Sequence, residues 1–379
     1  MKILQTIEFF TPTRGGSVNS VYNLSKELAK NGHDVTIITS DFEFDKEYAK
    51  SIRDEGVEVI SFHCKFNIDL FVYSPEIKSW IIENIKRFDI VHMHNFRSYQ
   101  NNIVSYYARK NNIPYILQAH GSVLPFFKKQ ILKKLYDLVW GNEILKNTTK
   151  VIALTKMEEK QYKKMGVNKD KIVIIPNTVD LSFFNHLPKK GTFREKYDIS
   201  LNTKMILYLG RLHKIKGIDL LIDAFSELQK DFPFSKLIIA GPDEGCLKIL
   251  QNQAEEMNVG NNIIFTGPLY GQDKLAAYID ANVYVLPSLY EAFPNTVLEA
   301  WACETPVIVT KECCISDIVL KAGLVVNRDK NHLKSALIDL MDDTKRNHFS
   351  NECKKVIREF ELANVTKKFE KVYNETAVL

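Results

Sequence analysis

The sequence predicts an α/β protein made of two doubly wound domains with parallel sheets. Short, nearly continuous apolar runs alternate with longer mixed segments, which is the pattern of buried parallel strands separated by helices. The alternation stops at residues 175–200, where prolines and polar residues cluster without a period, and it then starts again. A chain of 379 residues is also too long for one ordinary core and suits two domains of about 150–200 residues.

The first domain is expected over residues 1–182. The opening run MKILQTIEFF carries one Lys and stops being apolar at Glu8, so it is predicted to be a buried strand rather than a signal peptide. Strands are predicted at 3–6, 35–39, 58–62, 90–92, 114–118, 151–154 and 172–175. Helices are predicted at 17–30, 76–87, 101–110 and 128–146.

The second domain is expected over residues 183–362, where the same alternation returns. Its predicted strands lie at 205–209, 236–240, 262–266, 283–286 and 306–309. Its predicted helices lie at 217–231, 246–257, 273–280, 294–303 and 331–341. Two strongly helical segments close the chain.

The composition is that of a soluble globular protein, with 45% hydrophobic and 26% charged residues. No apolar run approaches the roughly 18–20 residues that span a bilayer. The net charge of +5 is compatible with an anionic ligand or lipid but is too small to indicate nucleic acid as a partner. The six cysteines include no Cys-x-x-Cys pair, and adjacent Cys313 and Cys314 fit a reduced cytoplasm better than an oxidising compartment.

Ligands of doubly wound sheets bind beyond the carboxyl ends of the strands, and with two domains the cleft between them is the expected site. Gly15 and Gly16 follow the first strand and directly precede a helix, so they either cradle a phosphate or form an ordinary turn. His120, in the triplet Ala-His-Gly after the strand at 114–118, either faces the cleft or caps the backbone. His92 and His94 alternate at another strand end, but no third metal ligand is evident, which favours structural or substrate contacts.

The second domain places two cations after its first strand. In the run GRLHKIKG, Arg211 is the first side chain beyond the strand and Lys216 precedes a helix. A forked guanidinium and a point charge together suit a diphosphate, and a solvated basic loop is the alternative. The chain lacks Gly-x-Gly-x-x-Gly and P-loop motifs, which disfavours a dehydrogenase and a Walker-type nucleotide site.

The run LYEAFPNTVLEAWA sets two carboxylates eight positions apart. Pro294 suits the first position of a helix, so that unpaired amides near Asn295, Thr296 and Val297 would face an anion. Glu291 precedes this helix and Glu299 lies about one turn into it. Since carboxylates accept hydrogen bonds from vicinal hydroxyls, the arrangement suits a sugar, a diphosphate and a ribose in a row.

These motifs resemble those of retaining GT-B glycosyltransferases, and the phrase EAFPNTVLEA resembles that of family 4. The span from Glu291 to Glu299 looks like the Glu-x7-Glu motif of these enzymes. Supporting matches occur in the family's order from the first strand to beyond residue 309: TPTRGGSVNS, AHG, IPNTVD, GRLHKIKG and AGPDEG.

The resemblance implies a GT-B fold, in which two Rossmann-like domains face each other across a deep cleft. The N-terminal domain would bind the acceptor and the C-terminal domain the nucleotide-sugar donor. The last helix would cross back to the N-terminal domain, so residues from about 363 to 379 would belong to it. The reaction would move a sugar from a nucleotide diphosphate to an acceptor and keep the anomeric configuration.

The resemblance also implies roles for individual residues. Arg211 and Lys216 would bind the donor diphosphate, Glu291 would contact the donor sugar, and His120 would contact the sugar near the reacting centre. Glu299 would hold the ribose hydroxyls, and the loop at 241–244 would lie near the base. The expected donor-binding set is completed by Gly15, Gly16, Gly210, Gly241, Pro294, Asn295, Thr296 and Val297.

The sequence departs from the family pattern at three places. Ala292 stands where Gly or Pro is frequent, Glu304 where Gly is usual, and Cys313-Cys314 where Gly-Gly is frequent. The last two departures could alter the pocket around the sugar, so they leave the donor open. Family frequency favours uridine and then guanosine as the base. A saccharide or lipid-linked saccharide in cell-surface polysaccharide or glycan biosynthesis is expected as the acceptor.

No Asp-x-Asp occurs in the chain, so no metal bridging the diphosphate is expected and no other cofactor is implied. Fixed cations at Arg211 and Lys216 would instead stabilise the leaving group. No nucleophile stands out beside His120. The resemblance suggests attack from the same face, with a donor phosphate oxygen taking the acceptor's proton.

The segment PFFKKQILKKLYDLVWGNEILKN predicts an amphipathic helix. Phe127, Ile131, Leu135, Leu138 and Val139 share one face, with Lys129, Lys133 and Lys134 opposite. A domain helix with one wet side is one interpretation. The other is peripheral contact with an anionic membrane that carries a lipid-linked acceptor, at the inner face of a cytoplasmic membrane.

Two rival functions share the nucleotide-sugar site. A sugar-nucleotide epimerase on a similar scaffold would return a changed sugar nucleotide rather than free nucleoside diphosphate. A non-catalytic nucleotide-sugar-binding subunit would form neither product, and the intact set of polar residues argues against it.

Overall fold

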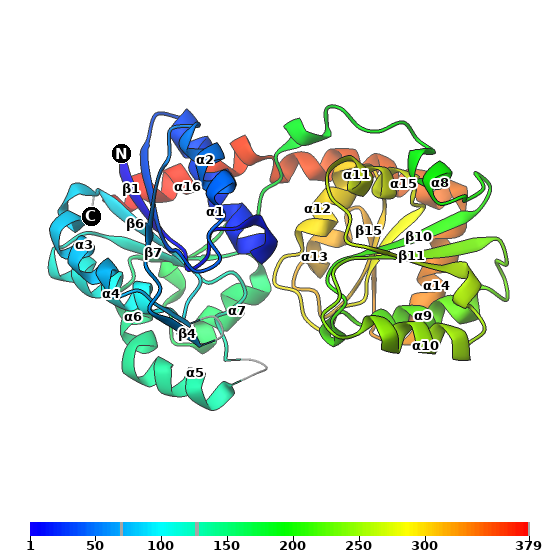
Figure 1. Ribbon diagram of the computed structural model, residues 1–379, viewed down its shortest axis with the longest axis horizontal. Helices are drawn as coiled ribbons and strands as arrows, with labels where there is room; N and C mark the ends of the chain where they lie inside the picture. Colours follow the sequence, from blue (N-terminus) through cyan, green and yellow to red (C-terminus); the bar gives the residue numbers. More distant parts are fainter. Residues whose placement is uncertain (69–70, 126–128, 378–379) are drawn as a thin grey trace. The chain divides into compact units, whose positions relative to one another are not determined.

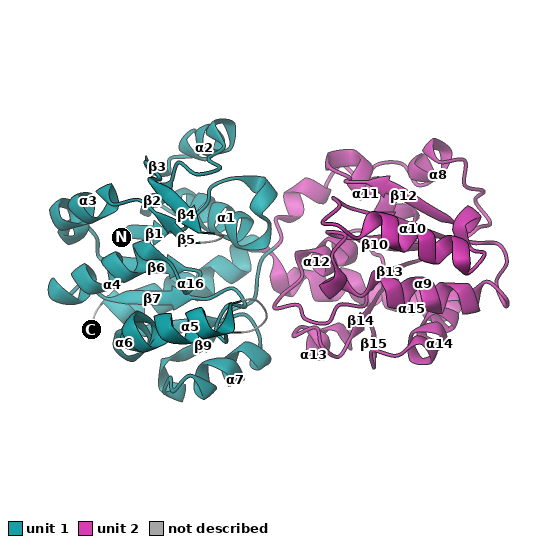
Figure 2. Ribbon diagram, turned by 60° about the horizontal axis from the view of Figure 1, so that its bottom comes forward, with its two compact units in different colours: residues 1–178, 362–379 teal, residues 179–361 magenta. Residues whose placement is uncertain are grey.

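The computed structural model describes residues 1–68, 71–125 and 129–377, which form two compact units (Figure 1). Unit 1 consists of Met1–Thr178 and Leu362–Leu379, and unit 2 consists of Val179–Glu361 (Figure 2). The boundary predicted at residue 182 lies inside the polar segment that follows the last strand of unit 1, and the structure divides the chain after Thr178.

Unit 1 is built on a seven-stranded parallel sheet in the order β3-β2-β1-β6-β7-β8-β9. Its strands are β1 (Lys2–Thr6), β2 (Asp34–Ser40), β3 (Glu58–Phe62), β6 (Ile90–His94), β7 (Tyr115–Gln118), β8 (Lys150–Ala153) and β9 (Ile172–Ile174). All seven predicted strands are present. The strand order reverses between β1 and β6, which makes their carboxyl ends the topological switch point where ligands of such sheets bind.

Helices cover both faces of this sheet, which explains why its strands are apolar throughout (Figure 1). Ile3 and Leu4 point to different faces of β1 and both are fully buried. The longer helices are α1 (Gly16–Lys30), α2 (Lys46–Arg53), α3 (Glu76–Asn84), α4 (Tyr99–Lys110), α7 (Lys156–Lys164) and α16 (Leu362–Ala377).

The C-terminal helix α16 packs within unit 1 rather than unit 2. Its Tyr373 hydroxyl lies 2.7 Å from His92 Nδ1 on β6, and its Glu370 carboxylate lies 3.1 Å from His33 Nε2. Phe369 and Tyr373 join the buried cluster between α1 and the sheet. The last segment of the chain therefore completes the core of the first unit.

Unit 2 repeats the architecture with a six-stranded parallel sheet in the order β12-β11-β10-β13-β14-β15. The strands are β10 (Lys204–Leu209), β11 (Ser235–Ala240), β12 (Ile263–Gly267), β13 (Val283–Leu286), β14 (Val307–Thr310) and β15 (Gly323–Val326). The longer helices are α9 (Ile218–Leu228), α10 (Leu247–Glu256), α11 (Gly271–Asp280), α12 (Asn295–Ala302), α14 (Lys330–Met341) and α15 (Asp343–Val356). Here the switch point lies between β10 and β13.

The helix predicted at 128–146 is present as an uninterrupted helical segment over the described residues 130–147, with a π-helical turn inside it. The chain forms α5 (Gln130–Tyr136), a π-helical turn at Asp137–Gly141 and α6 (Asn142–Asn147). A Cβ at Gly141 would lie 2.7 Å from Asp137 Oδ1, so the glycine permits close packing inside the turn. Phe127, which was predicted to share the apolar face, lies outside the described residues.

A short antiparallel hairpin, β4 (Phe66–Ile68) and β5 (Phe71–Tyr73), and the edge strand β15 are not among the predicted elements. Among the described helices, none is both long and apolar enough to cross a membrane.

Candidate functional site

Loops at the carboxyl ends of β10 and β11 are joined by backbone hydrogen bonds. Leu212 N–H donates to the Pro242 carbonyl at 2.8 Å, and Glu244 N–H donates to the Leu212 carbonyl at 3.1 Å. Gly241 has φ 151°, and a Cβ there would lie 1.8 Å from the Gly210 carbonyl oxygen. Only glycine fits this contact, which brings the two predicted donor-binding glycines together.

Lys216 and Glu291 form an ion pair and have mostly buried side chains, 14% and 15% exposed. Lys216 ends the loop after β10, and Glu291 lies in the loop after β13. Leu289 N–H donates to the Ile215 carbonyl at 2.8 Å and so ties the two loops together. The predicted diphosphate cation and the predicted sugar-binding carboxylate therefore meet directly, a pairing that sequence spacing did not reveal.

The two departures from the family pattern that follow Ala292 have visible structural roles. Cys314 N–H donates to the Glu291 carbonyl at 2.8 Å, so the Cys313-Cys314 step holds the backbone of the site carboxylate. Glu304 has φ 61°, a left-handed conformation that explains why glycine is usual at that position. The Glu304 side chain forms an ion pair with Lys354.

Arg211 is paired differently from Lys216. Its Nη1 lies 2.7 and 2.8 Å from the two carboxylate oxygens of Glu244, and its side chain is 56% exposed. The Tyr208 hydroxyl donates to the Arg211 carbonyl at 2.9 Å and steadies the start of the loop. An exposed ion pair of this kind is worth about 0–1 kcal/mol, so an anionic ligand can replace Glu244 at little cost.

Helix α12 begins one residue later than predicted. Pro294 is the N-cap residue with φ −77° and ψ 111°, so its assignment to the first helical position is wrong. Val297 N–H donates to the Pro294 carbonyl at 3.1 Å, and the prediction that its amide is unpaired is therefore also wrong. The extended proline lets its carbonyl close the first turn. Thr296 Oγ1 accepts a hydrogen bond of 2.7 Å from the Tyr284 hydroxyl.

Two side chains of α11 hold Glu299, and neither belongs to a motif that the sequence shows. Lys274 Nζ lies 2.8 Å from Glu299 Oε1, and the Tyr278 hydroxyl lies 3.1 Å from Glu299 Oε2. Lys274 and Tyr278 are four residues apart, so they share one face of the helix. Because a spacing of four residues is common in helices, it did not identify Lys274 and Tyr278 as site residues. These two contacts fix the orientation of the Glu299 carboxylate.

In unit 1, Gly15 and Gly16 form the junction between a short 3-10 turn and α1. Gly15 has φ 85°, and no heavy atom would lie within 4 Å of an added Cβ. Its glycine is therefore required by backbone conformation rather than by lack of space. Gly16 is the first residue of the 15-residue helix α1, whose N-terminal end carries partial positive charge.

His120 has φ 49° and is followed by Gly121 with φ 85°, so the loop after β7 turns through two left-handed residues. Gly121 N–H donates to Glu158 Oε1 at 2.6 Å, and Ala119 N–H donates to the Tyr162 hydroxyl at 3.0 Å. Both partners lie on α7. Burial raises the pKa of Glu158 to about 7.

Buried polar groups surround the carboxyl ends of β1, β6 and β7. His94 lies between Gln5 and His120. Its Nε2 is 2.8 Å from Gln5 Oε1, and its Nδ1 is 2.9 Å from His120 Nε2. Glu8, just beyond β1, is 4% exposed and accepts a hydrogen bond of 2.5 Å from Asn95 Nδ2. Burial raises the pKa of Glu8 to about 7. Gln5 and Glu8 could not be recognised from the sequence, because isolated polar residues in a strand and its loop form no motif.

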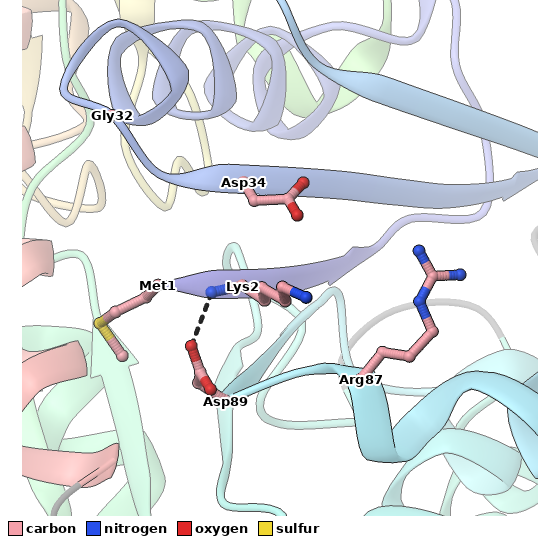
Figure 3. A pocket seen from close by; sticks show the side chains of 6 residues that line it. All are labelled: Met1, Lys2, Gly32, Asp34, Arg87 and Asp89. Atoms are coloured by element: carbon pink, nitrogen blue, oxygen red, sulfur yellow. Dashed lines mark hydrogen bonds between the residues drawn. The ribbon is translucent and has the colours of Figure 1, made fainter.

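A surface hollow of about 470 Å³ lies elsewhere in unit 1 (Figure 3). It is lined by Met1, Lys2, Gly32, Asp34, Arg87 and Asp89. These residues begin β1 and β2 or precede β6, so the hollow lies at the amino ends of the strands. Lys2 N–H donates to Asp89 Oδ2 at 2.7 Å. Its mixed charges and its place opposite the switch point separate it from the predicted site residues.

Among the described residues, no group of three or more His, Cys, Asp or Glu side chains is placed to hold a metal ion. All six cysteines are free thiols.

Two sequence families match the two halves of the chain. The family described as "Glycosyltransferase Family 4" matches residues 14–183, and "Glycosyl transferases group 1" matches residues 189–356. Together these matches cover most of both units.

Curated relatives and solved structures agree with these matches. An uncharacterized glycosyltransferase, MJ1607 of Methanocaldococcus jannaschii, is 26% identical over 84% of this chain and 83% of its own length. The UDP-Gal:alpha-D-GlcNAc-diphosphoundecaprenol alpha-1,3-galactosyltransferase of Escherichia coli is 27% identical over 77% of each chain. Anabaena HepE in complex with UDP-glucose superimposes with a TM-score of 0.81 at 17% identity, over 99% of this chain and 100% of that one.

Proposed function

The chain belongs to the family 4 glycosyltransferases and has the GT-B fold, and from that premise we propose a specific reaction. The enzyme transfers a sugar from a nucleotide diphosphate sugar to a saccharide or lipid-linked saccharide acceptor in glycan biosynthesis, with retention of the anomeric configuration. A UDP-sugar is the favoured donor and a GDP-sugar the second. The UDP-galactose named for the E. coli relative and the UDP-glucose bound by HepE support this order.

One observation carries the proposal. Arg211, Lys216 and Glu291 lie in the loops that follow β10 and β13, the two strands that flank the switch point of unit 2. Two cations there suit a diphosphate, and carboxylates suit sugar hydroxyls. An ammonium group has three donors, so Lys216 keeps others for a phosphate while one contacts Glu291.

In the proposed chemistry, Arg211 and Lys216 stabilise the negative charge that develops on the leaving diphosphate. Fixed charges aimed at a developing anion lower the barrier because they need little reorganisation. Glu291 orients the donor sugar, Glu299 holds the ribose, and His120 contacts the sugar near the anomeric carbon. We propose that a donor phosphate oxygen takes the acceptor's proton on the same face and that no resident metal is needed. A trapped glycosyl–enzyme adduct would contradict this mechanism.

The acceptor is proposed to reach unit 1 from an anionic membrane surface. Six large apolar side chains of α5 and the following π turn are 47–77% exposed: Ile131, Leu132, Leu135, Leu138, Val139 and Trp140. Lys133 and Lys134 lie on the same helix. Arg97, just after β6, pairs with Asp137 at 2.6 Å and so fixes this segment to the sheet. An apolar face beside lysines is typical of peripheral binding to anionic lipid. The cytoplasmic side of a membrane is the location that we propose.

A thermal-unfolding panel with UDP, GDP, ADP and their sugars tests the donor, because a ligand at 100 times its Kd stabilises the fold by about 2.7 kcal/mol. Product analysis with the best donor then tests the reaction. Release of nucleoside diphosphate together with a glycosylated acceptor supports transfer. A changed sugar nucleotide would indicate an epimerase, and binding without either product would indicate a non-catalytic subunit.

A further inference from the structure

We propose that His94, held by Gln5, is a positioning residue that keeps the ring proton of His120 on Nε2 and leaves His120 Nδ1 as a bare acceptor for a hydroxyl of the sugar donor. The identity of the ligand rests on the proposed function. The proton arrangement inside unit 1 does not, because it follows from contacts between protein side chains.

Three side chains on adjacent strands or strand ends form the chain of hydrogen bonds. Gln5 lies on β1, His94 ends β6 and His120 follows β7, and these strands are neighbours in that order. Gln5 Oε1 lies 2.8 Å from His94 Nε2, and His94 Nδ1 lies 2.9 Å from His120 Nε2. Gln5 and His94 are fully buried. Both ring nitrogens of His94 therefore have protein partners.

Burial keeps the histidines neutral near pH 7. It lowers the pKa of His120 to about 3. It lowers the pKa of His94 well below the ordinary value, with His92 and His120 adding to the effect. A neutral imidazole carries one ring proton, so one of its nitrogens donates and the other accepts.

The proton positions follow from the amide oxygen of Gln5, which can only accept. His94 must donate to it from Nε2–H, which leaves His94 Nδ1 without a proton. His94 Nδ1 then accepts from His120 Nε2–H, and His120 Nδ1 is left bare. That nitrogen is buried and has no hydrogen-bond partner among the described residues. Since buried polar atoms are normally paired, its lone pair is suited to a ligand hydroxyl.

A reversed Gln5 amide would invert every step. Its nitrogen would donate to His94 Nε2, His94 Nδ1–H would donate to His120 Nε2, and His120 would present Nδ1–H to the ligand. His120 would then donate a hydrogen bond to a ligand oxygen instead of accepting one from a ligand hydroxyl. The two arrangements therefore differ in an observable property, the nitrogen of His120 that carries the proton.

Nitrogen-15 NMR of the intact protein with labelled histidine measures this property directly. The signals of His120 are assigned by their loss in His120→Asn. We expect a protonated Nε2 and a bare Nδ1 in the wild-type protein without ligand. A protonated Nδ1, or rapid averaging between the two forms, would overturn the proposal whether or not the protein proves to be a transferase.

Gln5→Met removes the amide while keeping a side chain of similar length. We expect His120 to become a mixture of tautomers in this variant. His92→Leu is the matched control, because it removes a buried histidine of β6 whose hydrogen bond is to the Tyr373 hydroxyl rather than to His120. The tautomer of His120 should be unchanged in the control. An unchanged tautomer in Gln5→Met would overturn the role given to Gln5.

Kinetics separate positioning from general stability. At metal sites, groups that orient a functional histidine are worth about 10- to 100-fold in activity, and we expect a loss of that order in kcat for His94→Leu. His94→Asn, which keeps an oxygen near the position of Nδ1, should recover part of it. UDP affinity should not change in either variant, because the proposed nucleotide site lies in unit 2. Full kcat in His94→Leu would overturn the proposal, whereas a wild-type protein inactive with every donor would instead refute the proposed function.

Discussion

Lys216 and Glu291 form a largely buried ion pair between two loops, although they lie 75 positions apart in the sequence. Each residue was expected to contact the donor separately. Their pairing means that each side chain helps to fix the orientation of the other. It also places the predicted diphosphate cation beside the predicted sugar-binding carboxylate, an arrangement that would need little reorganisation during the proposed transfer.

A double-mutant cycle should show this dependence. For Lys216→Met and Glu291→Gln we expect a coupling free energy within about 0.5–3 kcal/mol, measured by denaturant unfolding, because either single change leaves a mostly buried charge unpaired. The exposed pair Arg211 and Glu244 is the matched control and should couple by less than about 1 kcal/mol. Additive effects at Lys216 and Glu291 would contradict the geometry.

Arg211→Ala should reduce turnover with little effect on folding. Its side chain is more than half exposed, so the melting temperature should hardly change. Loss of a charge-stabilising contact should lower kcat by about 10²–10³-fold. Arg109→Ala removes another exposed arginine that pairs with a glutamate, in unit 1, and should leave turnover unchanged. Near-normal activity in Arg211→Ala would refute the diphosphate assignment.

Glu299→Gln should distinguish ribose binding from diphosphate binding. We expect the affinity for UDP to fall by about 10- to 100-fold, the range for a lost hydrogen bond to a charged group. The affinity for inorganic pyrophosphate should not change. Calorimetric titration measures both. Glu304→Gln, which removes an exposed carboxylate of unit 2, is the control. Equal losses for UDP and pyrophosphate would refute the ribose assignment.

Glu8 should make the folded protein less stable as the pH rises from about 5 to 8. Burial raises its pKa from 4.5 to about 7, so the folded state binds more protons than the unfolded state within that window. The free energy of unfolding therefore has its full contribution from protonated Glu8 below about pH 4.5. This contribution is lost as the pH rises through about 7. Glu8→Gln should therefore become more stable relative to wild type between pH 5 and pH 8, by at most roughly 3 kcal/mol. Glu158 titrates in both proteins and cancels in this comparison. A constant difference across the range would contradict the prediction.

Leu138→Asp should weaken membrane binding if the exposed face of α5 and its π turn contacts lipid. Leu138 is 73% exposed, so the change should not disturb folding. Co-sedimentation at low salt with vesicles containing anionic lipid should fall for this variant and for Lys133→Gln, and vesicles of neutral lipid should bind weakly. Ile249→Asp changes a similarly exposed apolar residue in unit 2 and is the control. Absence of wild-type binding to anionic vesicles would exclude the membrane proposal.

Much of the fold followed from the sequence because parallel strands buried on both faces leave continuous apolar runs. The close contact of Gly241 with the Gly210 carbonyl shows a local backbone requirement for glycine, and a requirement of this kind leaves a trace in a sequence motif. Pro294 was misplaced by one position because proline is tolerated both at the N-cap and in the first turn. The π turn at Asp137–Gly141 could not be predicted, because the extra residue leaves the segment helical on both sides.

The pairings within the site could not be predicted in the same way. Lys274 and Tyr278 reach Glu299 from another helix, and Gln5 reaches His94 from another strand. Such contacts depend on strand order and on crossing geometry, which a pattern along one chain does not encode. Sequence motifs indicated the candidate site residues, and the structure showed which side chains hold Glu299 and His94 in place.

The central claim is that Arg211 and Lys216 bind the diphosphate of a nucleotide-sugar donor. Calorimetric titration of UDP, GDP and ADP into the wild-type protein and into the double variant Arg211→Ala and Lys216→Met tests it most directly. We predict saturable binding of at least one nucleoside diphosphate, UDP first, and a loss of at least about 100-fold in the double variant. Equal binding by both proteins, or no binding of any of the three nucleotides to the folded wild-type protein, would contradict the account.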